Sequence, residues 1–148
     1  MSKVLTWSLS LVLLGTAVLM TATRLSYASG NSPQTNSSVQ EFWNKFRAAV
    51  IKGDKASVTA LTRFPVEMPY GMASVKNRTQ LISRYRKVFK GQTDAAKCFR
   101  TAKPQSDPDN AKLFSVACKN AAGHEVIIYS FARTANGWKF VGLDNLNE

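Results

Sequence analysis

The sequence predicts an α+β domain in which three helices pack on one face of an antiparallel four-stranded sheet. Two observations predict this class. Apolar residues recur at helical spacing between residues 38 and 90, whereas the residues after 96 are rich in the β-branched and aromatic types that favour strands. Short turn signals separate these later segments, so the strands are expected to follow one another as a meander.

The first predicted helix covers residues 38–52. A capping box opens it, with Ser38 at the cap and Glu41 three positions later. Gly53 ends this helix, and Asp54 is placed to cap a second, shorter one. The apolar face of the first helix consists of Val39, Phe42, Trp43, Phe46, Ala49 and Val50.

The third predicted helix lies within residues 76–91, which contain six Lys or Arg and no acid. Its apolar stripe consists of Leu81, Ile82, Tyr85, Val88 and Phe89. The opposite arc carries Arg84, Arg86, Lys87 and Lys90. Such an arc is ordinarily a solvated face. Surface helices commonly intersperse glutamates among their cations, so the absence of acids here makes a contact surface for an anionic partner the alternative.

Four strands are predicted after residue 96. Residues 97–103 and 111–119 form the first hairpin, around a turn that contains two prolines. Residues 124–134 and 138–144 form the second hairpin. Its Asn-Gly turn at residues 136–137 is the strongest short hairpin signal.

The two cysteines, Cys98 and Cys118, are expected to form a disulfide, because the chain has the features of an exported protein. A hairpin symmetric about Pro108 would place them directly opposite each other. Opposed Cα atoms in an antiparallel pair lie about 4.5–5.5 Å apart, which is within disulfide range.

Residues 1–28 have the pattern of a secretory signal peptide, with a basic start, an uncharged run over residues 4–23 and small residues before a cleavage point after Ala28. The alternative is an uncleaved inner-membrane anchor, because an uncharged run of this length can just span a bilayer. Residues 29–37 are a polar tether, and residues 38–148 form the folded domain. Either way, the domain is expected outside the cytoplasm, periplasmic or secreted.

The chain is strongly basic, with 20 Lys or Arg against 9 Asp or Glu and a net charge of +11. Removal of residues 1–28 takes away Lys3 and Arg24 and leaves +9, because 18 basic residues then face 9 acidic ones. Such a charge favours an anionic surface as partner, for example lipid headgroups or cell-wall polymers. Export makes nucleic acid the least favoured partner.

Four features together resemble the nuclear transport factor two-like superfamily: an aromatic first helix with "FWNKF", a "GD" break into a second helix, a basic third helix and a closing "FARTANGWKFVGLD". The closing hairpin is most similar to the small exported, SnoaL-like members. The resemblance covers residues 38–147 and implies a cystatin-like cone, in which a curved sheet wraps around a helix. It also implies an apolar pocket in many members and pairing of two copies through their sheets. The superfamily contains enzymes, ligand binders and assembly subunits, so it implies no single activity.

A pocket of this kind would lie between the first helix and the sheet, and its lining would be aromatic. The same rings are equally well explained as core. The candidates for the lining are Phe42, Trp43, Tyr70, Tyr85, Tyr129 and Trp138.

Few residues suggest catalysis. The single histidine, His124, follows a turn and has no second histidine or cysteine pair at ligand spacing, so we expect no metal and no cofactor. Glu67 is the one carboxylate that could act as a pocket base, because it lies among apolar residues; the alternative is a solvated loop glutamate. It lies in residues 63–74, where two prolines and a glycine predict an extended loop or an edge strand.

Three functions remain open on the sequence. The first is an exported, non-enzymatic domain that binds a small apolar ligand or an envelope protein partner. The second is a pocket enzyme that transfers protons through Glu67. The third is a membrane-tethered subunit of an envelope assembly, with residues 4–23 retained as the anchor.

Overall fold

A computed structural model describes residues 34–69, 73–120 and 122–146. The predicted signal peptide, the alternative anchor, most of the tether and Tyr70 lie outside these ranges. The elements are α1 (Gln34–Lys52), α2 (Lys55–Ala60), β1 (Thr62–Glu67), α3 (Arg78–Lys90), α4 (Ala95–Cys98), β2 (Gln105–Ser106), β3 (Leu113–Lys119), β4 (Val126–Thr134) and β5 (Gly137–Asn145). No helix in the described part of the chain is both long and apolar enough to span a bilayer.

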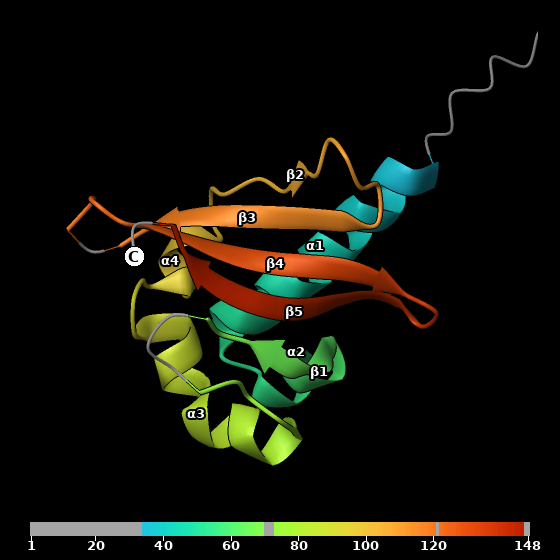
Figure 1. Cartoon of the computed structure of the whole chain (residues 1–148). Coiled ribbons are helices and arrows are strands. Elements are labelled where there is room, and N and C mark those ends of the chain that lie inside the picture. Colours follow the sequence, from blue (N-terminus) through green and yellow to red (C-terminus); the bar gives the residue numbers. More distant parts are fainter. Residues whose placement is uncertain (1–33, 70–72, 121, 147–148) are drawn as a thin grey trace, which may run out of the picture. The chain divides into compact units, whose positions relative to one another are not determined.

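The sheet has five strands in the order β1-β5-β4-β3-β2 (Figure 1). Strands β2 to β5 pair antiparallel, and β1 pairs parallel to β5. This confirms the α+β class and the cystatin-like arrangement of N-terminal helices on a mostly antiparallel sheet, and it corrects the predicted four strands to five. The fifth strand, β1, confirms the edge-strand alternative predicted within residues 63–74, and its Pro65 lacks an N–H, which is tolerated at the edge of a sheet.

Helix α1 begins at Gln34, so the predicted cap at Ser38 is wrong. Ser38 lies inside the helix, where its hydroxyl accepts a hydrogen bond from Nε1 of Trp138 at 3.4 Å. The predicted end is confirmed, since Gly53 follows α1 with φ +70°, a backbone conformation that favours glycine. Asp54 caps α2 as predicted, and its Oδ1 accepts a hydrogen bond from the backbone N–H of Ser57 at 3.0 Å.

The prediction of a strand over residues 97–103 is wrong. Its first residues belong to helix α4, which Asp94 caps by accepting a hydrogen bond from the backbone N–H of Lys97 at 3.1 Å. The physical reason is local, because an aspartate followed by two alanines is a helix start that outweighs the symmetry of the cysteine spacing. The disulfide is nevertheless confirmed, with 5.8 Å between the Cα atoms of Cys98 and Cys118. It joins α4 to β3 rather than one strand to another.

The core lies between the helices and one face of the sheet, which α1 crosses (Figure 1). Phe46 of α1 is at its centre, 5.0 Å from the Phe131 ring and 5.5 Å from the Phe140 ring between centroids. Phe89 of α3 and Phe99, which follows α4, contact the same cluster. Aromatic side chains remove large apolar areas from water, so this layer provides most of the stability of the fold.

Candidate functional site

The aromatic residues predicted to line a pocket are packed into the core. Phe42, Trp43, Tyr85, Tyr129 and Trp138 are each at most 8% exposed. Rings contact rings throughout: the Trp43 and Phe99 centroids are 4.8 Å apart, and those of Phe114 and Trp138 are 5.0 Å apart. The structure therefore brings five of the six candidates into one packed layer.

Two buried phenol groups hold elements of this core together. The Tyr85 hydroxyl donates to the carbonyl of Val50 at 3.4 Å, and the Tyr129 hydroxyl donates to the carbonyl of Val88 at 3.3 Å. Burial, and then the negative charge of Asp54, raises the pKa of Tyr85 to about 12. Burial is also the main cause that raises the pKa of Tyr129. Both phenols therefore stay neutral near neutral pH and act as structural donors.

Glu67 ends strand β1 on an exposed position. Its Oε2 accepts a hydrogen bond from the Ser74 hydroxyl at 3.1 Å. The two neighbouring positions, Val66 and Met68, are buried, as the alternation of a strand requires. Glu67 is therefore exposed at the end of its strand, whereas a carboxylate that acts as a pocket base is normally enclosed by the pocket.

His124 is also exposed, and its backbone N–H donates to the Asn120 side chain at 3.1 Å. Within the described ranges there is no group of three or more histidine, cysteine or carboxylate side chains that could hold a metal ion.

The four basic candidates lie along α3. The Arg84 guanidinium donates to the carbonyl of Ala73 at 3.3 Å, and Arg86, Lys87 and Lys90 are exposed. The predicted apolar stripe of this helix is confirmed except at Ile82, which is 37% exposed and lies at the margin of the buried face.

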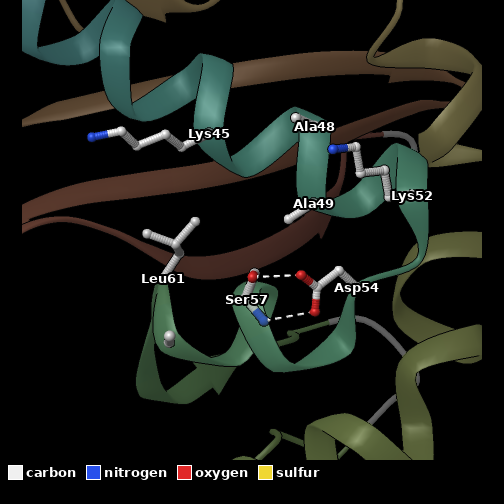
Figure 2. A pocket seen from close by; sticks show the side chains of 8 residues that line it. Lys45, Ala48, Ala49, Lys52, Asp54, Ser57 and Leu61 are labelled. Carbon is white, nitrogen blue, oxygen red and sulfur yellow. Dashed lines mark hydrogen bonds between the residues drawn. The ribbon is translucent and has the colours of Figure 1, made fainter.

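A groove of about 400 Å³ lies between α1 and α2 (Figure 2). Its volume falls within the range of small-molecule sites. Four side chains make an apolar floor: Ala48, Ala49, Ala60 and Leu61. Four polar ones complete the lining: Lys45, Lys52, Asp54 and Ser57. We call this the α1–α2 groove.

The charges of this groove are not all neutralised. Lys45 forms an ion pair with Glu41 at 2.7 Å, one helical turn away. Asp54 accepts hydrogen bonds from both the side chain and the backbone of Ser57, and these bonds, aided by the charge of Lys52, lower the pKa of Asp54 (Figure 2). Lys52 forms no ion pair with a described residue. The groove therefore offers an apolar floor with an available ammonium group beside it.

Sequence reasoning missed this groove because its floor comes from two segments that meet only in the folded chain. The sequence contains only a weak signal for this groove. Ala48 lies on α1 between two lysines, and Ala60 ends α2, so alanines occur where each helix could approach the other closely.

No protein-family model matches the chain, and no curated protein matches its sequence. Solved structures do resemble it. A nuclear transport factor two-like protein with a cystatin-like fold from Novosphingobium aromaticivorans is 16% identical over 75% of this chain and 80% of that chain, with a TM-score of 0.44. A domain of unknown function with a cystatin-like fold from Nostoc punctiforme is 14% identical over 79% of each chain, with a TM-score of 0.45.

A ketosteroid isomerase-like protein from Erwinia carotovora atroseptica is 14% identical over 76% of this chain and 95% of that chain, with a TM-score of 0.46. A hexachlorocyclohexane dehydrochlorinase from Novosphingobium barchaimii also resembles the chain, at a TM-score of 0.45. These likenesses concern the fold, which occurs in both binding proteins and enzymes, and they assign no activity to this chain.

Proposed function

We propose that this protein is an exported, non-enzymatic binding domain that holds a small amphipathic ligand, with an apolar body and an acidic group, in the α1–α2 groove. The observation that carries the proposal is the lining of the groove, in which an alanine and leucine floor adjoins the ammonium of Lys52, which forms no ion pair with a described residue. Apolar area provides binding energy and one charged group fixes orientation, which is the usual division of labour in small-molecule sites.

The close packing of the interior favours a ligand-binding site on the surface of the domain. The rings of α1, α3 and the sheet are in mutual contact, with centroid separations between 4.5 and 6.3 Å. The α1–α2 groove has no aromatic side chain in its lining. A ligand that entered the interior would have to displace packed aromatic side chains, which costs about 1–3 kcal/mol or more for overpacking.

The test is a titration with decanoate, a straight-chain carboxylate, followed by calorimetry, with decanol as the uncharged probe. Saturable binding of decanoate is expected, and Lys52→Met should weaken it by about tenfold while decanol binding stays unchanged. Ala48→Trp fills the groove and should abolish the binding of both probes. Ala111→Trp is the matched control, since Ala111 is exposed and lines none of the described grooves. Equal losses in Ala48→Trp and Ala111→Trp would contradict the proposal, as would the absence of binding.

The other two functions have their own tests. The exposed position of Glu67 gives no support to the enzyme. The enzyme hypothesis would be supported if the wild type turned over enolisable carbonyl substrates and Glu67→Gln did so at a lower rate. Mass spectrometry of the protein isolated from its host decides between export with cleavage, which leaves Ser29 as the first residue, and a retained anchor. Gel filtration of the same material tests the expected homodimer.

A further inference from the structure

A second grooved surface surrounds α4. Two hollows meet at Thr101, which lines both. The first, of about 430 Å³, lies between α1 and residues 100–104 and includes Gln40, Trp43, Arg47, Arg100 and Lys103. The second, of about 520 Å³, lies between α4 and the end of β3 and includes Asp94, Lys97, Cys98 and Lys119. We call the two hollows together the α4 groove.

The α4 groove gathers cations from three separate parts of the sequence. Arg47 comes from α1, Lys119 from β3, and Lys97, Arg100 and Lys103 from α4 and the residues after it. None of these five side chains forms an ion pair with a described residue. Like charges that share a concave surface repel each other, so the arrangement favours occupation by an anion.

The one carboxylate in the groove, Asp94, lines the second hollow, and no carboxylate is part of the lining of the first. Asp94 Oδ1 accepts a hydrogen bond from the backbone N–H of Lys97 at 3.1 Å and so caps α4. Thr93, beside it, donates its hydroxyl hydrogen to the carbonyl of Lys119 at 2.7 Å. Asp94 therefore caps α4, and Thr93 joins the residues before α4 to the end of β3.

Trp43 provides an independent observation at the same place. Its side chain lines the first hollow and has no solvent exposure. Its Nε1 is buried and has no hydrogen-bond partner among the described residues. A buried donor without an acceptor costs about 1–3 kcal/mol, so a side chain in the wall of this hollow carries a polar group that the fold leaves unsatisfied.

We propose that the first hollow of the α4 groove binds a phosphate group, with Arg47, Arg100 and Lys103 as its cationic partners. Arginine presents a planar fork of donors that matches phosphate oxygens, and two arginines with a lysine supply more donors and charge than one carboxylate can accept. Gln40 and Thr101 add neutral hydrogen-bonding groups to the same hollow. The phosphate can be free in solution or part of a phospholipid headgroup.

The α4 groove is a better anion site than the basic arc of α3. Arg86, Lys87 and Lys90 are exposed along α3 and line neither the α1–α2 groove nor the α4 groove. Their charges lie along one exposed helix, where solvent and salt screen them, whereas a concave wall concentrates the field of its cations. This moves the expected anionic contact from the exposed arc of α3 to the hollow between α1 and residues 100–104.

The experiment compares two double variants that each remove two positive charges. Arg47→Gln with Arg100→Gln alters the groove, and Arg86→Gln with Lys87→Gln alters α3. The oxidised protein is titrated with inorganic phosphate and, separately, with vesicles of phosphatidylcholine that contain or lack phosphatidylglycerol. Phosphate binding is followed through the indole N–H resonances, which Trp43→Phe assigns, and vesicle binding through co-sedimentation.

The groove variant should lose about tenfold or more in affinity, and the α3 variant less than about threefold. Binding of inorganic phosphate that competes with the vesicles identifies a site for free phosphate, and binding of phosphatidylglycerol vesicles alone identifies a headgroup site. Equal losses in the two double variants would reduce the effect to net charge and overturn the proposal. It would also be overturned by the absence of binding to both probes, or by phosphate binding that leaves the Trp43 resonance unmoved. Thermal denaturation checks that both variants fold.

Discussion

The inner face of the sheet and the α4 groove differ in how their polar and charged groups are paired. Inside, rings contact rings, and the hydroxyls of Tyr85 and Tyr129 are both used on backbone carbonyls. Around α4, five cations line two adjoining hollows without an ion pair to any described residue. The core thus uses both of these phenols to hold the fold together, whereas the surface leaves charge available for a ligand.

The largest expected effect is on the interior. Phe46→Ala removes the ring at the centre of the aromatic layer and should lower the free energy of unfolding by about 3–5 kcal/mol, because a cavity forms where the ring was. Leu146→Ala is the control, since Leu146 is 64% exposed, and should change it by less than about 0.5 kcal/mol. Urea denaturation measures both. A small loss for Phe46→Ala would mean that the interior is less tightly packed than the structure shows.

The disulfide, which lies where interior and groove meet, should have the next largest effect. Replacement of Cys98 and Cys118 by alanine should cost about 3 kcal/mol, because the unfolded chain is no longer closed into a loop. Dithiothreitol should destabilise the wild type by a similar amount and leave the double variant unchanged. If the reductant has the same effect on both proteins, the bond is not the source of the stability.

Tyr85 should make stability depend on alkaline pH. Its pKa is raised from 10.0 to about 12 by burial and then by Asp54, so the folded state holds this proton more strongly than the unfolded state does. The contribution is therefore complete below about pH 10 and is lost as the pH rises through about 12. Urea denaturation across this range should show a shallower decline for Tyr85→Phe than for the wild type. Parallel declines would show that the phenol does not ionise differently in the two states.

The smallest expected effect is at the surface, on the α2 cap. The pKa of Asp54 is lowered mainly by its hydrogen bonds with Ser57, so its charge stabilises the folded state above the ordinary carboxyl pKa of 3.8, and that contribution disappears as the pH falls through the lower folded value. Asp54→Asn keeps a capping side chain but has no charge to titrate. Melting temperatures measured in acid should therefore fall less steeply for Asp54→Asn, and Asp109→Asn, on an exposed loop, serves as the control.

The elements that sequence predicted well are those with a strong local pattern. The stripe of α3, the Gly53 stop, the Asp54 cap and the β4–β5 hairpin each depend on residues that are close in sequence. The error at residues 97–103 arose because two local signals competed there, and the helix cap at Asp94 outweighed the symmetric cysteine spacing. The parallel pairing of β1 with β5 joins residues far apart in sequence, for which no local pattern exists.

The candidate sites show the same limit. Phe42, Trp43 and Tyr129 were singled out from their spacing, and spacing identifies buried positions without saying whether they enclose a space. Both grooves escaped prediction because their walls are assembled from distant segments. Arg47 and Arg100 are individually ordinary surface arginines, and only the packing of α4 beside α1 brings them to one hollow.

The bond between Cys98 and Cys118 has a consequence for when the second hollow of the α4 groove is fixed in place. Cys98 forms part of the wall of the α4 groove, and its bond is what ties the short helix α4 covalently to β3. In a reducing compartment this tie is absent, so α4 would be held beside β3 by non-covalent contacts alone. For a protein that is exported, as proposed above, oxidation would then act as a maturation step that fixes the second hollow only after the protein has left a compartment rich in nucleotides and nucleic acids.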